Sequence, residues 1–230
     1  MNATENPQPE KGRDEEDYLE IARLGAKLGV PIPLAHVVID VHDNNTLISH
    51  YKQRSRSWNR NFWNLILLIA TRSSGVATNF GAGYLSVKST DATVAALADF
   101  QTWPNLSGAI NVSTNGIQAG TGAAAESFEG YALNTICANG TGANQLVYSA
   151  ASANAQAYVA GTKTWTVTLK RLFNNNSAAD ILVTETAITG LRVGGTKYDM
   201  ICRDLLAVPQ NVAVGLQLTV SYPVTLVFPA

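Results

Sequence analysis

The sequence is poor in charge. Only 14% of its 230 residues are Asp, Glu, Lys or Arg, whereas an average soluble domain carries about 25%. The net charge of −1 gives no overall field that would steer the chain to nucleic acid or to a membrane. Much of the surface must therefore consist of Ser, Thr, Asn, Gly and Ala, or be covered by other subunits. Such a surface suits a protein that packs against copies of itself, although an ordinary neutral β protein is the alternative.

Cysteines and long apolar runs are also scarce. The two cysteines, Cys137 and Cys202, form no C-x-x-C motif, which favours a reducing compartment and leaves disulfide pairing open. The longest apolar run, residues 65–70, is too short to cross a bilayer. The polar N-terminal segment has no apolar signal core. We therefore expect neither a signal peptide nor a membrane partner.

The common catalytic signatures are missing as well: G-x-S-x-G, H-E-x-x-H and G-K-[ST] do not occur. Residues 120–125 (GTGAAA) match the start of a dinucleotide fingerprint. A true site also needs a βαβ unit and an acidic residue about 20 positions on, yet the next acidic residue after Glu129 is Asp180. We interpret this segment as a glycine-rich turn, and we expect no enzymatic activity and no nucleotide.

One set of side chains has metal-binding chemistry. His36, Asp40 and His42 share one parity on a predicted strand, and His50 would lie across the hairpin. Together they could in principle bind a metal ion. We favour a half-exposed polar strand face, because closed tetrahedral sites use more closely spaced ligand pairs. No metal or other cofactor is expected.

The pattern predicts two parts. Residues 1–33 form an N-terminal arm with a helix at 14–28, capped by Asp14 and ended by Gly29, Pro31 and Pro33. Residues 34–230 form a β-rich structural domain that contains one more helix, at about 58–71, with Ser57 as its N-cap. Predicted strands cover residues 36–42 and 46–52, joined by a turn at 43–45, and residues 84–88, 108–113, 164–173, 181–188 and 198–203.

The final segment, residues 216–228, is the clearest strand. Seven successive alternate positions from Leu216 to Phe228 are apolar, which predicts a strand with one buried face. Pro223 lacks an N–H and should mark an interruption in its pairing, on a sheet edge, at a bulge or where a neighbouring subunit takes over. Many short strands with Gly-rich turns favour a mainly β fold with a β-sandwich or jelly-roll-like body.

A basic stretch interleaved with aromatic residues runs through residues 52–63. Its cations could line the outer face of a strand, contact another subunit, or bind nucleic acid. Nucleic acid is the least favoured of the three, because the net charge is near zero. The acidic N-terminal helix is a natural electrostatic partner, in the same subunit or a neighbouring one. The candidate subunit-contact residues are Asp14, Glu15, Glu16, Asp17, Glu20, Lys52, Arg54, Arg56 and Arg60.

Three stretches together resemble a known group of proteins. The first is residues 55–64 (SRSWNRNFWN). The second combines residues 116–123 (GIQAGTGA), 127–133 (SFEGYAL) and 140–148 (GTGANQLVY), and the third combines 203–206 (RDLL) and 212–222 (VAVGLQLTVSY). In order and spacing, this series is similar to uncharacterised virion structural proteins of tailed bacteriophages, encoded among head and tail genes. It covers about residues 35–230 and leaves the arm outside.

The resemblance implies a virion component, assembled in the bacterial cytoplasm through contacts with itself and with other virion proteins. It does not assign the chain to capsid, decoration, neck, collar or tail. The arm, which lies outside the resemblance, is then a candidate attachment device. The main alternative is a carbohydrate- or receptor-binding module of a tail fibre or spike, since Trp103, Tyr158 and Trp165 could stack on sugars.

Overall fold

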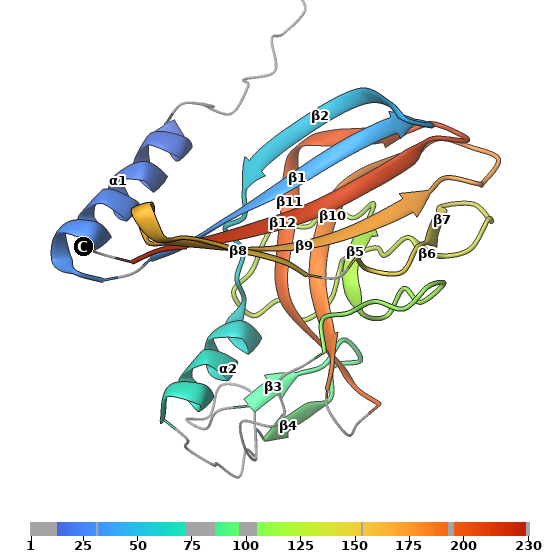
Figure 1. The fold of residues 1–230 in the computed structure, drawn as a ribbon. Helices are drawn as coiled ribbons and strands as arrows, with labels where there is room; N and C mark the ends of the chain where they lie inside the picture. The colour runs from blue at the N-terminus through green and yellow to red at the C-terminus, as the bar shows by residue number, and fades with distance from the viewer. Residues whose placement is uncertain are drawn as a thin grey trace, which may run out of the picture.

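The computed structural model describes residues 13–30, 32–71, 86–96, 105–152, 154–192 and 196–228. The fold is mainly β, as the sequence predicts: twelve strands and two α-helices occur within these ranges (Figure 1). The helices are α1 (Arg13–Leu28) and α2 (Arg60–Thr71). The strands are β1 (Ile32–Asp43), β2 (Thr46–Arg54), β3 (Ser86–Lys88), β4 (Val94–Ala96), β5 (Gly116–Gly120), β6 (Ala138–Asn139), β7 (Gln145–Tyr148), β8 (Ala155–Val159), β9 (Thr164–Asn174), β10 (Ile181–Leu191), β11 (Tyr198–Val212) and β12 (Gln217–Val227).

The largest sheet has seven strands in the order β2-β1-β12-β9-β7-β6, and β8 pairs with the free end of β9. A second sheet has the order β11-β10-β5, and β3 and β4 form a small hairpin. In Figure 1 the three-stranded sheet lies behind the larger one and crosses it. Alternation of side chains puts the odd positions of β1 on one face, where Val37 and Ile39 are buried. They share one hydrophobic core with Ile188 of β10 and Ile201 of β11.

Strand β12 lies in the middle of the larger sheet, between β1 and β9. Its predicted apolar face is confirmed at Leu218, Val220 and Tyr222, which have no exposed surface. The pairing with β1 is interrupted opposite Pro223: partners run from Ile32 to Ala35 and resume at Val38 in the same register. The predicted interruption is therefore present, but the expected edge or bulge is not: Pro223 lies in a central strand and pairs with Thr168 of β9 in an unbroken register. The missing N–H removes ladder bonds on one side of the strand only.

Helix α2 begins two residues later than predicted. The prediction of Ser57 as the N-cap is wrong, and Asn59 has this role instead. The side-chain oxygen of Asn59 accepts the N–H of Phe62 at 3.2 Å, as an N-cap residue does. The Asn59 amide also donates to the carbonyl oxygens of Gly130 and Met200, at 2.8 and 2.7 Å. Asn59 is therefore held by long-range contacts that the local pattern could not reveal.

The strand predictions were right for the hairpin and for the long C-terminal strands, but two details differ. Residues 108–113 were expected to be a strand and instead form a loop with a turn at 110–111. The short strands β4, β5, β6, β7 and β8 were not predicted, because segments of two to five residues, several rich in Ala, Gly and Gln, give a weak alternating pattern. In the first hairpin Asn44 adopts a positive φ of 52°, which fits the turn expected at 43–45.

Helix α1 packs against the start of β1. Tyr18 is buried, its hydroxyl donates to the carbonyl oxygen of Ala35 at 3.3 Å, and its ring meets His36 edge-on at 5.6 Å. The ladder of β1 begins at Ile32, just before the expected domain boundary at residue 34. The role of residues 1–33 as an arm stays a prediction, and residues 1–12 lie outside the described ranges. Neither described helix is long and apolar enough to cross a membrane.

Candidate functional site

One end of the larger sheet carries an uncovered aromatic surface. Tyr158 of β8 pairs with Trp165 of β9, Trp165 pairs with Leu226 of β12, and Leu226 pairs with Pro33 of β1. Paired residues in a ladder share a face, so this row continues the face that forms the hydrophobic core. Phe228 follows Leu226 by two positions and lies on the same face.

Exposure rises steadily along this face, away from the second sheet. On β9, Phe173 is fully buried, Leu169 is partly buried and Trp165 is 43% exposed. Tyr158 is 59% exposed and Phe228 is 37% exposed. The core face of the larger sheet is thus longer than the second sheet that covers it, which leaves its far end open.

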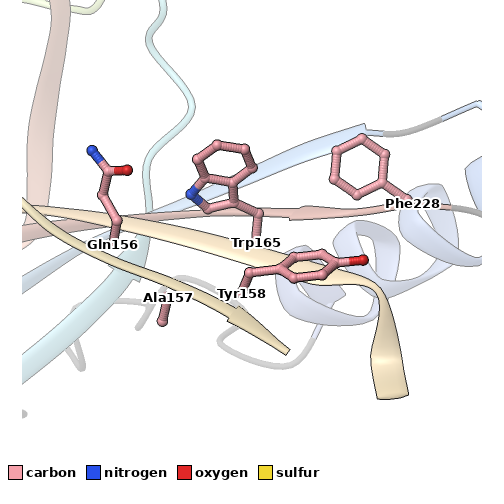
Figure 2. A pocket seen from close by; sticks show the side chains of 5 residues that line it. All are labelled: Gln156, Ala157, Tyr158, Trp165 and Phe228. Carbon is pink, nitrogen blue, oxygen red and sulfur yellow. The ribbon is translucent and has the colours of Figure 1, made fainter. Parts of the chain in front are cut away.

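These aromatic residues line a shallow hollow of about 630 Å³, which we call the aromatic surface: Gln156, Ala157, Tyr158, Trp165 and Phe228 (Figure 2). Figure 2 shows the Trp165 ring between Gln156 and Phe228, with the Tyr158 ring extending along the same side of the hairpin. The described lining has no charged side chain; its polar groups are the Gln156 amide, the Tyr158 hydroxyl and the Trp165 indole N–H, so the surface favours apolar contact over charged ligands. Trp103, the third aromatic residue considered for sugar stacking, lies outside the described residues.

A second hollow, of about 280 Å³, follows on the same sheet face. Val167, Leu169 and Val224 form its sheet side, and Phe62 and Trp63 of α2 also line it. Because Trp165 and Val167 are successive residues on this face of β9, the two hollows adjoin. Together they make an apolar strip from α2 to the end of the sheet.

Only the first part of the basic segment lies on a strand face, as one interpretation expected, because β2 ends at Arg54. Lys52 and Arg54 pair with Val38 and His36, on the face of β1 opposite to the core. The Arg54 guanidinium lies 4.4 Å from the centre of the Tyr18 ring of α1, so a cation–π contact joins the basic strand to the helix.

The next two arginines bind a nearby loop. Arg56 lies 3.5 Å from the Glu126 carboxylate, and Arg60 lies 2.6 Å from that of Glu129. The Arg60 guanidinium also lies over the Phe128 ring, at 5.7 Å. In the acidic helix Glu16, Asp17 and Glu20 are exposed, while the side chains of Asp14 and Glu15 lie outside the described ones. Subunit contact by these acidic residues stays a prediction.

The glycine-rich segment has a structural partner that sequence reasoning missed. The Glu185 carboxylate is fully buried and accepts the N–H groups of Gly122, Asn134 and Thr135 at 2.8–3.2 Å. It also pairs with Arg203 at 2.6 Å. Arg203 in turn donates to the carbonyl oxygens of residues 124 and 125. The segment after Gly120 thus forms a loop without the expected turn, and a buried ion pair holds that loop.

Arg171 organises a second loop. Its side chain is fully buried in the core face of β9 and packs over the Tyr148 ring at 4.7 Å. Burial lowers the pKa of Arg171. Its three guanidinium nitrogens donate to five backbone carbonyl oxygens at 2.6–3.1 Å, those of Ala109, Val112, Asn115, Ile117 and Ser149.

A third buried cluster surrounds Asp204. Its carboxylate accepts the Ser55 hydroxyl at 2.7 Å, the Arg56 N–H at 3.0 Å and the Cys202 thiol at 3.3 Å. Burial raises the pKa of Asp204, and the hydrogen bonds from Ser55 and Arg56 oppose this rise. Burial also raises the pKa of Cys202 well above its ordinary value. A raised thiol pKa disfavours the thiolate, so this Ser-Cys-Asp group is suited to holding β11 against residues 55–56.

Two further candidates from the sequence are the histidine–aspartate set and the two cysteines. His50 Nδ1 lies 2.6 Å from the Asp40 carboxylate across the hairpin, and no group of three or more metal-ligating side chains occurs in the described ranges. Cys137 and Cys202 are both free and buried. Burial, with a smaller effect from the charge of Glu185, raises the pKa of Cys137 to about 12.

Comparison with known proteins adds no relative: no family model, curated protein or solved structure matches this chain.

Proposed function

We propose that the chain is a non-catalytic structural subunit of a tailed-bacteriophage particle, built in through contacts with copies of itself and with other virion proteins. The observation that carries the proposal is the aromatic surface. A core face that ends uncovered at Tyr158, Trp165 and Phe228 is suited to burial by another chain.

The use of polar groups in the described residues supports the same function. Arg171, the Glu185–Arg203 pair and Asp204 are buried and hydrogen-bonded to backbone groups of loops. Such bonds stabilise long connections between strands, because each buried carbonyl or N–H needs a partner. Loops held by buried hydrogen bonds, together with low charge, suit a repeated assembly unit.

We further propose that the body is a two-layered β-sandwich related to jelly rolls, and that residues 1–33 act as an attachment arm. Residues from the larger sheet and the three-stranded sheet share one core, which supports the layered arrangement. The arm proposal is supported by α1, which meets β1 through Tyr18 while Leu19, Leu24 and Leu28 remain exposed.

The alternative, a carbohydrate- or receptor-binding module, is favoured by the same exposed Tyr158 and Trp165. Aromatic rings can stack on sugar faces, but sugar recognition also needs several polar groups to fix orientation. Apart from the polar ends of the Tyr158 and Trp165 rings themselves, the described lining of the aromatic surface supplies one such group, the Gln156 amide, and no charged side chain. Subunit contact is therefore the function that we propose first.

The test is to purify particles of the phage that encodes this chain and to locate the chain by antibody-labelled electron microscopy. We expect labelling at a defined, repeated position in intact particles, and no labelling of particles from a deletion mutant. A chain lacking residues 1–33 should fold but fail to enter particles. Absence of the full chain from purified particles would contradict the virion function, and normal incorporation of the truncated chain would contradict the arm.

A further inference from the structure

Strand β8 forms an open edge next to the aromatic surface. It pairs with β9 on one side, from Ala155–Thr168 to Val159–Thr164. No other described strand pairs with its second side. All five of its residues are exposed, so both its side chains and its outer backbone edge face solvent. An edge of this kind presents N–H and C=O groups that can pair with a further strand.

The composition of β8 gives this edge none of the usual protection against pairing. Edge strands commonly carry charged side chains, proline or a bulge, which prevent association. The sequence of β8, AQAYV, contains no charge and no proline, and its ladder with β9 has an unbroken register. The opposite edge differs: β2 carries His50, Lys52 and Arg54, and the ladder between β1 and β2 has a register shift.

Charge therefore distinguishes the two edges. Two copies that met through β2 would bring Lys52 and Arg54 against the same cations, which is unfavourable. Two copies that meet through β8 oppose no charges within the strand. Pairing through β8 also brings the two aromatic surfaces side by side on one sheet face, so that Tyr158 and Trp165 can be buried together.

We propose that β8 pairs with β8 of a second copy of this chain, antiparallel and about a two-fold axis, so that the larger sheet continues across both copies. The inference rests on the self-assembly part of the proposed function. With the axis at Ala157, each Ala157 faces its counterpart, and Gln156 faces Tyr158 of the second copy. This is an isologous contact, in which one patch is complementary to itself.

The central position makes a direct test possible with the full-length chain. Ala157 is exposed, so Ala157→Lys and Ala157→Glu should leave the thermal unfolding temperature nearly unchanged. Each variant alone places like charges opposite one another, and self-association should weaken about tenfold or more. An equal mixture of the two variants places Lys opposite Glu and should restore the dimer. Ile48→Lys, on the exposed opposite edge, is the matched control and should associate like the unmodified chain.

Sedimentation measurements over a range of concentrations give the outcome. Dimerisation of the unmodified chain, its loss in each variant and its recovery in the mixture would support the inference. A chain that is monomeric at about 100 µM, or variants that dimerise as well as the unmodified chain, would overturn it. Because the measurement is made in solution, its failure is distinct from absence of the chain from particles, which concerns the virion function.

Discussion

Replacing Arg171 with Met should be among the most damaging single changes in the domain. Met keeps most of the volume of the buried Arg171 side chain but has no hydrogen-bond donor. The five carbonyl oxygens that accept from Arg171 therefore lose this partner, two of them in residues 105–112 and three in residues 115–149. Hydrogen bonds from a charged group contribute about 1.5–3 kcal/mol each, while loss of the cation also removes its desolvation cost. The net loss in the free energy of unfolding should be about 3–5 kcal/mol.

That loss is large against a typical total of about 5–15 kcal/mol, and it should lower the melting temperature by about 6–20 °C for a chain of this size. The assay is urea unfolding followed by circular dichroism, combined with amide hydrogen exchange. Exchange should accelerate most in residues 105–118, where four of the five freed carbonyl oxygens lie. The matched control is Lys170→Met, which removes an exposed cation from the adjacent position and should change stability by less than about 0.5 kcal/mol. A loss below about 1 kcal/mol in Arg171→Met would refute the idea that this side chain organises the loop.

Three further predictions concern the other buried groups. Gly122→Ala should destabilise the fold by about 1–3 kcal/mol, because a Cβ there would overlap the Glu185 carboxylate that accepts the Gly122 N–H. Gly161→Ala is the control: Gly161 has open space around it, so this variant should be nearly neutral in the same unfolding assay. Because Cys137 and Cys202 are buried, alkylation followed by mass spectrometry should find both unmodified in the folded chain and both modified in urea. Rapid labelling of the native chain would contradict their burial. Burial raises the pKa of Asp204 above its ordinary 3.8, so its contribution to stability is full below about pH 4 and declines as the pH rises through the folded-state pKa. The difference in free energy of unfolding between the unmodified chain and Asp204→Asn should therefore fall from about pH 4 to about pH 7, and a constant difference would count against this assignment.

The sequence by itself determined the elements whose signals are local. The alternation from Leu216 to Phe228 predicts β12, and the apolar spacing after Asp14 predicts α1, because side-chain direction repeats every two residues in a strand and every 3.6 in a helix. Turn residues such as Asn44 likewise identify the first hairpin. The mainly β class follows from these signals.

Only the tertiary structure decided which polar groups meet. Gly122 and the Glu185 that binds it are 63 positions apart, and Arg171 reaches carbonyl oxygens up to 62 positions away. Nothing in a local pattern distinguishes a buried arginine on a strand from an exposed one. The open edge of β8 was equally hidden, because an edge is defined by which strands fail to pair, and pairing is set by how the whole chain closes around its core.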